Sequence, residues 1–237
     1  MNEPSVSGVL SYASAGRTDR GVVRPNNQDA FIVRPESGIW VVADGMGGYE
    51  RGELASLMVC DGLLNLQPDV TLEATSLAVR HRLSKINSKL HRMATRLIAP
   101  MKCGTTVVAL LARGADCEVL WAGDSRAYRL RGGKLDLLTR DHVWKGFGGM
   151  LGEHSSTITR AVGGEAGLEL DTWRGRVRSG DRYMLCSDGI SRSLSDEAIQ
   201  ECLLLPGLKT AAHALIEEAI AAGSSDNVTA VVIEATG

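Results

Sequence analysis

The sequence contains few aromatic residues and carries almost no net charge. Its 237 residues include two Phe, four Tyr and four Trp, so an aromatic platform that stacks nucleic-acid bases is not expected. The formal net charge is -2, which gives no electrostatic reason to expect nucleic acid or an anionic membrane as a partner. These two absences point away from nucleic-acid binding.

Closely spaced cysteines and long apolar segments are also missing. The five cysteines form no C-x-x-C pair, and an odd count without metal-site spacing is typical of reduced thiols in a cytoplasmic protein. No apolar run approaches the roughly 20 residues that cross a bilayer, and the N-terminus lacks the basic and apolar stretches of a signal peptide. The sequence therefore predicts a cytoplasmic protein without a membrane partner.

The composition is that of an ordinary globular protein, with 44% hydrophobic and 23% charged residues. No linker or internal repeat divides it, so we expect a single domain over residues 1–237. Short runs rich in Val, Leu, Ile and Trp predict β-strands. They cover Phe31–Val33, Ile39–Ala43, Thr105–Leu111, Cys117–Ala122, Ala127–Leu130, Leu168–Trp173, Arg182–Cys186 and Asn227–Ile233.

Helices are predicted in two groups by apolar residues that recur at steps of three and four. The predicted helices are Gly52–Leu66, Thr71–Ile98, Ser195–Leu205 (with Ser195 as the N-cap) and Leu208–Ala222. Because strands and helices do not alternate strictly, antiparallel sheets with helices packed outside them are favoured over a doubly wound fold. Glycines concentrated in the segment at about 139–157 predict a mobile, functional excursion.

An aspartate lies at the edge of four of the predicted strands. Each of them alone is ordinary turn chemistry, but four at strand edges indicate a shared cleft. Carboxylates that converge must be paired or metal-bound. No matching set of Lys or Arg accompanies them in the sequence, so hard divalent cations are the expected partners. The four are Asp44, Asp124, Asp188 and Asp226.

Oxygen ligands favour Mg²⁺ or Mn²⁺, and zinc is not expected because no His or Cys accompanies these positions. Two ions that share Asp44 would hold a bridging water, lower its pKa and direct it at a phosphorus atom. Such a site would attract an anionic phosphoester. Gly45 allows a backbone carbonyl to face an ion, and Gly47 and Gly48 allow a substrate to come close.

Eight motifs occur in order along nearly the whole chain. They are VRPNNQDA (Val23–Ala30), VVADGMGGYERGELAS (Val41–Ser56), GTTVVALL (Gly104–Leu111), AGDSRAYRLRGGKL (Ala122–Leu135), LTRDH (Leu138–His142), ITRAVGG (Ile158–Gly164), LCSDGISRSLSDEAI (Leu185–Ile199) and SSDNVTAVVI (Ser224–Ile233). The set resembles the bacterial branch of the metal-dependent Ser/Thr protein phosphatases, the type 2C phosphatases.

The resemblance implies a four-layer α-β-β-α sandwich, in which two antiparallel sheets pack face to face with helices outside. It implies an enzyme that hydrolyses phosphoserine and phosphothreonine in proteins by metal-activated water, with two Mg²⁺ or Mn²⁺ ions as cofactors. The expected partners are phosphorylated proteins, including a bacterial Ser/Thr kinase that the enzyme opposes and the substrates of that kinase. We expect a monomer.

The resemblance also assigns roles to individual residues. Asp44 would bridge both ions and Gly45 would add its carbonyl oxygen. Asp188 and Asp226 would complete the ligand set of one of the two ions. Asp124, together with Asp188, would support a weaker third ion. On the substrate side of the site, Arg24 would grip the substrate phosphate through its bidentate fork, and Asp29 would orient the attacking water.

Some positions depart from the family pattern or leave a role open. Gln28 stands where many relatives have Glu, which removes a negative charge near a metal, and Asn227 next to Asp226 is a further candidate. Met46 follows the first Asp-Gly, as in bacterial relatives, where animal relatives have a His proposed as general acid. His142 and His154 are then candidates for the proton donor. The flap-like segment 143–157 is shorter than the flap of many bacterial relatives. Substrate selection is therefore the property that can least be inferred from the resemblance.

Two alternatives compete with this interpretation. The segment from Cys186 to Arg192 fits the C-x5-R loop of cysteine-dependent phosphatases, although Asp188 inside such a loop would repel a phosphate. The second alternative is a phosphoprotein-binding regulator with weakened catalysis, for which Gln28 gives some support.

Overall fold

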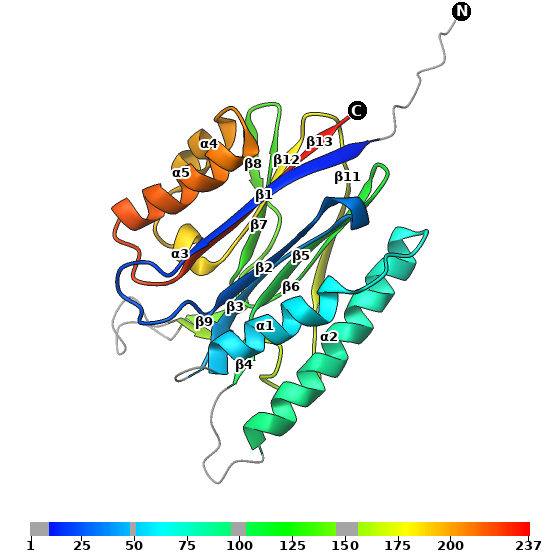
Figure 1. Cartoon of the computed structure of the whole chain (residues 1–237), viewed down its shortest axis with the longest axis vertical. Coiled ribbons are helices and arrows are strands. Elements are labelled where there is room, and N and C mark those ends of the chain that lie inside the picture. Colours follow the sequence, from blue (N-terminus) through cyan, green and yellow to red (C-terminus); the bar gives the residue numbers. More distant parts are fainter. Residues whose placement is uncertain (1–9, 48–50, 96–102, 146–155) are drawn as a thin grey trace, which may run out of the picture.

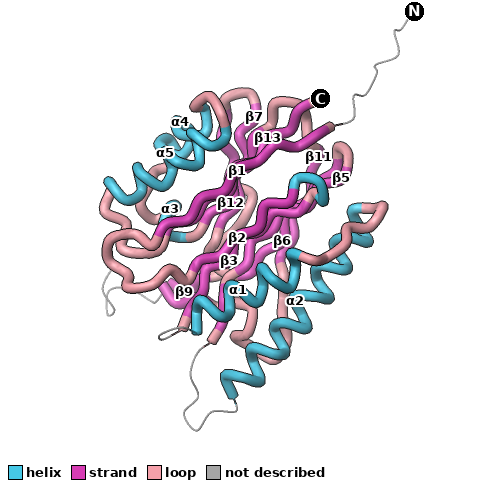
Figure 2. Tube along the Cα trace, in the orientation of Figure 1, coloured by secondary structure: helices cyan, strands magenta, loops and turns pink. Residues whose placement is uncertain are grey.

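The computed structural model describes residues 10–47, 51–95, 103–145 and 156–237. Two antiparallel sheets pack face to face, and helices cover the outer face of each (Figures 1 and 2). The predicted four-layer α-β-β-α architecture is therefore confirmed. No helix among these described ranges is both long enough and apolar enough to cross a membrane.

The first sheet has the strand order β1-β13-β12-β7-β8 and the second has the order β11-β6-β5-β3-β2, with β4 paired to β3. A separate two-stranded hairpin joins β9 and β10. The strands are β1 (Ser11–Asp19), β2 (Asp29–Arg34), β3 (Ile39–Met46), β4 (Gly104–Thr105), β5 (Val107–Arg113), β6 (Asp116–Ala122), β7 (Arg126–Arg131), β8 (Lys134–Leu137), β9 (Val143–Lys145), β10 (Ser156–Ile158), β11 (Asp171–Arg176), β12 (Arg182–Cys186) and β13 (Val228–Thr236).

The helices divide between the two outer faces. In Figure 1, α1 and α2 cover the sheet that contains β3, and α3, α4 and α5 lie on the side of the sheet that contains β12. Their bounds are α1 (Arg51–Leu64), α2 (Leu72–Thr95), α3 (Asp188–Ser191), α4 (Asp196–Leu204) and α5 (Leu208–Ala221), and a 3₁₀ turn η1 covers Pro35–Ser37.

The central strands are buried on both faces. In β3, Trp40 and Val42 belong to the core between the two sheets, whereas Val41 and Ala43 belong to the core under α1 and α2. Successive side chains of a strand point to opposite faces, so a strand in the middle of a four-layer stack reads as a continuous apolar run. This explains why Ile39–Ala43 contains no polar residue until Asp44 leaves the core.

The strand predictions hold best for such buried runs. The edge strand β1 was not predicted, because its sequence SYASAGRTD is small and polar and much of it is only half-buried. Ser195 is confirmed as the N-cap of α4, where its side chain accepts a hydrogen bond from the Ala198 backbone N–H. Of the predicted excursion at about 139–157, residues 146–155 lie outside the described residues, and β9 and β10 pair on either side of them.

Candidate functional site

Two carboxylates face each other at one end of the second sheet. Asp29 begins β2 and is paired with Asp44 near the end of β3. The backbone of Asp44 is fixed from the neighbouring segment, because its carbonyl oxygen accepts from the Thr106 N–H at 2.8 Å and from the Thr105 hydroxyl at 2.9 Å. The Asp44 N–H in turn donates to the Thr106 hydroxyl at 3.0 Å. The strand end is thus rigidly held.

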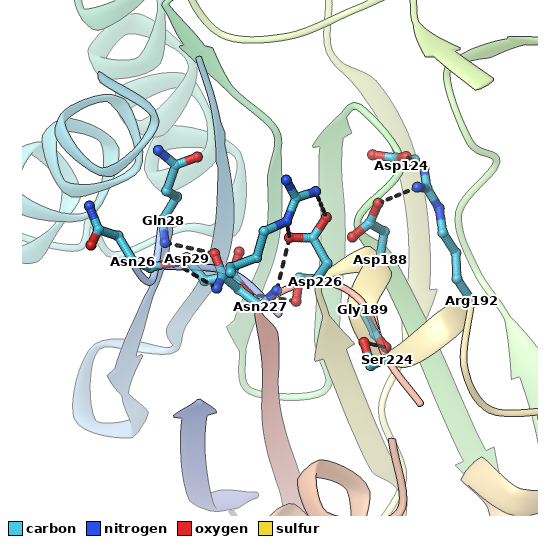
Figure 3. A network of polar contacts seen from close by, with 12 residues as sticks. Asn26, Gln28, Asp29, Asp124, Asp188, Gly189, Arg192, Ser224, Asp226 and Asn227 are labelled. Carbon is cyan, nitrogen blue, oxygen red and sulfur yellow. Dashed lines mark hydrogen bonds and ion pairs between the residues drawn. The ribbon is translucent and has the colours of Figure 1, made fainter. Parts of the chain in front are cut away.

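The other predicted carboxylates reach the same region from the first sheet. Asp188 opens α3 directly after β12, and Asp226 lies just before β13. Asp124 lies in the turn between β6 and β7. Figure 3 shows these three aspartates together with Asp29, Gln28 and Arg192. The structure therefore brings together residues that are up to 198 positions apart, from Gln28 to Asp226, and Asp124 and Asp188 are almost completely buried.

Asp29 is held by two hydroxyl groups. Its Oδ2 accepts from the Thr229 hydroxyl at 2.6 Å and from the Ser187 hydroxyl at 2.7 Å. Its Oδ1 is buried and has no hydrogen-bond partner among the described residues. Burial raises the pKa of Asp29 to about 7; the two hydroxyl donors oppose this, and the charges of Asp188 and Asp226 add to it. The pKa of Asp29 is raised because no positive charge among the described residues offsets its burial.

The same shortage of positive charge affects the neighbouring carboxyls. Burial raises the pKa of Asp44 well above its ordinary value, and the charges of Asp29 and Asp188 raise it further. Burial, followed by the charge of Asp124, raises the pKa of Asp188 to about 6. Burial also raises the pKa of Asp124, against the lowering effect of Arg192. Buried like charges are costly unless cations compensate them.

Among the described residues, two arginines pair with aspartates of the site, which is fewer than the five carboxyls that lie there. Arg24 makes a bidentate pair with Asp226, with Nε 2.9 Å from Oδ1 and Nη2 2.7 Å from Oδ2. Arg192 contacts both Asp188 and Asp124. The sequence did not reveal this pairing, because Arg24 and Asp226 are 202 positions apart.

The donor set can be tested against the implied ions. No group of three or more His, Cys, Asp or Glu side chains in the described ranges is compact enough to hold a metal ion by itself. However, Asp188 Oδ1 is buried without a hydrogen-bond partner, and the Asp44 carboxyl lies in the field of four other carboxyls. Mg²⁺ characteristically takes only one or two carboxylates and keeps several waters. The residues therefore fit hard divalent ions that are bound largely through water.

Gly45 is required by the packing of three backbone segments. A Cβ atom at this position would lie 2.0 Å from the Gly52 carbonyl oxygen at the start of α1 and 2.7 Å from the Gln28 carbonyl oxygen. Any side chain here would push β3, the segment at Gln28 and α1 apart. Sequence reasoning expected Gly45 to free its carbonyl for an ion, and the structure adds this second reason for glycine. Gly48 lies outside the described residues.

Gln28 and Asn227 connect the segment that carries Arg24 to the start of β13. The Asn227 Oδ1 accepts from the Gln28 N–H at 2.8 Å, and its Nδ2 donates to the carbonyl oxygens of Arg20 and Asn26. The Gln28 Nε2 donates to the Gly47 carbonyl at 3.4 Å. Asn227 thus shapes the loop in front of the site.

His142 lies beside the site with both ring nitrogens in contact with protein groups. Its Nδ1 accepts from the Gly123 N–H at 3.2 Å, its Nε2 lies 3.2 Å from Asp171 Oδ2, and its ring stacks on Trp121. This geometry favours a role in holding the turn before Asp124 over a role as proton donor. His154 lies outside the described residues, and the Met46 side chain has no proton to donate.

The structure argues against the cysteine-dependent alternative. Cys186 is fully buried in the core between the first sheet and its helices, and burial raises the pKa of its thiol to about 12. A nucleophilic cysteine needs a lowered pKa and access to substrate, and Cys186 has neither.

Four supporting residues were missed by sequence reasoning. They are Thr106, Ser187, Thr229 and Arg192. Ser187 and Thr229 lie within one or three residues of a predicted aspartate, so their positions in the strand-end motifs were the available signal. Arg192 follows Asp188 by four positions, a spacing that brings side chains together on a helix.

Comparisons with known proteins agree with this geometry. Residues 21–222 match the family model for protein phosphatase 2C. The serine/threonine protein phosphatase PstP of Mycobacterium tuberculosis is 40% identical over 240 residues, which covers 95% of this chain and 45% of PstP. The chain thus spans about half the length of that relative.

Two solved structures are similar over almost the whole chain. PppA, described as a key regulatory component of T6SS in Pseudomonas aeruginosa, has a TM-score of 0.90 at 37% identity, with 96% of this chain and 99% of PppA covered. The catalytic domain of PstP in complex with two manganese ions has a TM-score of 0.84 at 36% identity, with 96% and 100% covered.

Proposed function

Since the chain belongs to the protein phosphatase 2C family, we propose that it is a Mg²⁺- or Mn²⁺-dependent protein phosphatase that hydrolyses phosphoserine and phosphothreonine. The observation that carries this proposal is the group of buried carboxyls at one edge of the sandwich, with raised pKa values at Asp29, Asp44 and Asp188. A protein tolerates such a group only where protons or cations neutralise the carboxyls, and divalent ions do so at neutral pH. The manganese-bound PstP structure supports the choice of ion.

We assign the ligand roles to Asp44, the Gly45 carbonyl, Asp188 and Asp226. Two divalent ions would supply Lewis acidity, lower the pKa of a water molecule and offset the negative charge of the phosphoester. Asp188 Oδ1 has no hydrogen-bond partner in the described part of the chain, so it is available for this purpose. The rigid hold of Thr106 on the Asp44 backbone keeps that carboxyl in one position.

Asp29 has the position of a residue that orients the attacking water. Its Oδ2 is occupied by Ser187 and Thr229, which fixes the plane of the carboxyl and leaves Oδ1 to accept a hydrogen bond. A water held at that oxygen would have one lone pair directed away from Asp29, toward a phosphorus atom. Preorganisation of this kind lowers the barrier without any movement during the reaction.

Arg24 is the proposed phosphate ligand. Its side chain is about half exposed and comes from the loop in front of the site. Its guanidinium group makes a bidentate pair with the Asp226 carboxylate, and the same fork matches two oxygens of a phosphate. In this proposal Arg24 exchanges the carboxylate for the substrate phosphate. The leaving alkoxide takes its proton from water or another group, since Met46 cannot supply one.

We extend the proposal to the partners. PppA is described as a regulatory component of a secretion system, which supports a signalling role in which the phosphatase opposes a Ser/Thr kinase. The free, buried state of all five cysteines supports a reducing, cytoplasmic environment. The single domain over residues 1–237 and the monomeric state stay predictions.

The test is hydrolysis of a phosphothreonine peptide and of p-nitrophenyl phosphate by the purified chain. We expect activity that requires Mn²⁺ or Mg²⁺, is lost with EDTA and returns when the metal is added back. Asp44→Asn keeps the shape of the side chain but removes its charge. Loss of a residue that only supports a metal ligand typically lowers activity by roughly 10- to 100-fold, and loss of the ligand Asp44 itself should lower kcat by more than this. Ser88→Ala, on the exposed side of α2, is the control and should keep full activity.

The same experiment separates the alternatives. Activity that survives EDTA but is lost in Cys186→Ser would favour the cysteine-dependent mechanism. Absence of hydrolysis, combined with phosphopeptide binding that Arg24→Ala abolishes, would favour the phosphoprotein-binding regulator. That second alternative has little structural support, because all four aspartates are present and assembled and the Gln28 side-chain amide donates to the Gly47 carbonyl.

A further inference from the structure

Arg192 lies one helical turn after Asp188. α3 covers Asp188–Ser191, and Arg192 is its C-cap, with its N–H donating to the Asp188 carbonyl oxygen at 2.8 Å. Side chains four positions apart lie on the same face of a helix. The turn of α3 therefore places the Arg192 side chain on the same face as the Asp188 carboxyl.

The guanidinium group bridges two carboxylates that come from different strand ends. Its Nη1 lies 3.0 Å from Asp188 Oδ2, and its Nη2 lies 2.6 Å from Asp124 Oδ2. Figure 3 shows Arg192 reaching toward both aspartates. Asp124 is 3% exposed, so this contact is made by a buried carboxyl. Charge-assisted bonds of this length are among the stronger interactions in proteins.

Arg24 provides a contrast within the same site. It comes from a loop and reaches a carboxylate 202 positions away, and this loop is held beside Asp226 by hydrogen bonds from Asn227 to the backbone of Arg20 and Asn26. Arg192 and Asp188 belong to the same short turn. Both arginine side chains are about half exposed, but Arg192 pairs with two carboxylates, whereas Arg24 pairs with one.

Asp124 and Asp188 are also the two residues that the family resemblance assigns to a weaker third ion. Each of them gives one oxygen to Arg192. A guanidinium group stays protonated at all relevant pH values, so a divalent ion at this position would meet a positive charge and would compete with Arg192 for the two Oδ2 atoms. Asp124 Oδ1 and Asp188 Oδ1 have no hydrogen-bond partner among the described residues, but the proposed function assigns Asp188 Oδ1 to one of the two main ions. A third ion would therefore find one available carboxylate oxygen, Asp124 Oδ1, beside a guanidinium group. The residues present do not fit a third ion.

We propose that Arg192 is a built-in cation between Asp124 and Asp188, and that this chain binds two divalent ions and no third. This inference rests on the proposed function, because it concerns the same metal centre. The arginine would offset one of the two negative charges of the pair. It also gives a role to the arginine of the C-x5-R segment, whose cysteine is buried and inert.

The test counts bound ions directly. Mn²⁺ is titrated into the metal-free chain, and bound and free Mn²⁺ are quantified by electron paramagnetic resonance and by isothermal titration calorimetry, in the absence of substrate. We expect two ions per chain for the wild type and for Arg192→Lys, which keeps the charge. Arg192→Ala and Arg192→Asp should gain a third, weaker binding event. Adding Asp124→Ala to either variant should remove that event and leave two ions.

Arg129→Ala is the matched control, because Arg129 pairs with Asp136 in the same way on the opposite hairpin strand. It should leave the count at two. A third ion in the wild type that Asp124→Ala removes would overturn the inference, as would a count of two in correctly folded Arg192→Ala and Arg192→Asp. In both cases, hydrolysis that EDTA abolishes would leave the proposed function standing. Binding of no ion to the wild type would overturn the proposed function and this inference with it.

Discussion

Asp29 and Asp44 are direct neighbours across the antiparallel pair β2 and β3. Like charges directly opposite each other destabilise a sheet, and both carboxyls have raised pKa values because they are buried. Their position can be explained only if protons or cations neutralise them. This pair therefore links the stability of the fold to the binding of metal.

The first prediction concerns the pH dependence of stability without metal. A carboxyl whose pKa is higher in the folded state binds more protons when folded, so its contribution to stability is complete below the unfolded pKa of about 4 and is lost as pH rises through the folded value. The folded values are about 7 for Asp29 and about 6 for Asp188. The melting temperature of the EDTA-treated chain should therefore fall between about pH 5 and pH 8.

Scanning calorimetry at several pH values measures this effect. Saturating Mn²⁺ should raise the melting temperature more at pH 8 than at pH 5, because the ions then replace protons that have left. Asp29→Asn should flatten the curve of the metal-free chain, since its side chain does not titrate. A melting temperature that rises with pH in EDTA would contradict the pKa directions.

The second prediction concerns Thr229. Its hydroxyl donates to Asp29 Oδ2 at 2.6 Å and contacts the Thr18 hydroxyl at 2.7 Å. Thr229→Val removes one of the two donors that orient Asp29 and should lower the free energy of unfolding by about 1–3 kcal/mol. It should also lower kcat by about 10- to 100-fold. Urea denaturation and phosphopeptide kinetics measure the two effects.

Thr18→Val is the matched variant for this prediction. It removes the contact between the two hydroxyls and the bond from the Asn27 side chain to Thr18, but leaves the bond from Thr229 to Asp29. It should therefore retain most of the activity even if it is somewhat less stable. Equal losses of kcat in Thr18→Val and Thr229→Val would show that the orientation of Asp29 is not the cause.

The sequence was most informative where an apolar run ends in a polar residue. Asp44 and Asp188 could be predicted as site residues because four aspartates at strand edges together indicate a shared cleft, although each alone is ordinary turn chemistry. The layered fold could be predicted in part, since runs such as Val107–Leu111 pack on two cores at once. Local patterns predict sheets with helices outside them, whereas the four-layer arrangement was implied by the family resemblance.

The partners of these carboxyls could not be predicted in the same way. Thr229 reaches Asp29 across 200 positions, and the pairing depends on how β13 and β2 come together in the two sheets. The edge strand β1 has no apolar pattern because one of its sides has no neighbouring strand. Arg192 is an exception, because its spacing of four positions from Asp188 is visible in the sequence and is the spacing of side chains that meet on a helix.

The third prediction concerns Arg24, which has two roles that a substitution should separate. Its guanidinium group pairs with Asp226, and in the proposed function it binds the substrate phosphate. Arg24→Ala should raise KM for a phosphothreonine peptide by about 10- to 100-fold, which is the loss of a charge-assisted contact worth about 1.5–3 kcal/mol. The effect on kcat should be smaller.

The same substitution should strengthen metal binding. Without Arg24, no guanidinium group competes with Mn²⁺ for the Asp226 carboxylate, so the apparent Kd for Mn²⁺ should fall in a calorimetric titration. Arg24→Lys should show a smaller rise in KM than Arg24→Ala, because an ammonium group keeps the charge but cannot pair with two oxygens at once. An unchanged KM in Arg24→Ala would remove this residue from substrate binding. A weaker affinity for Mn²⁺ would show that Arg24 supports the metal site, contrary to the competition expected from its contact with Asp226.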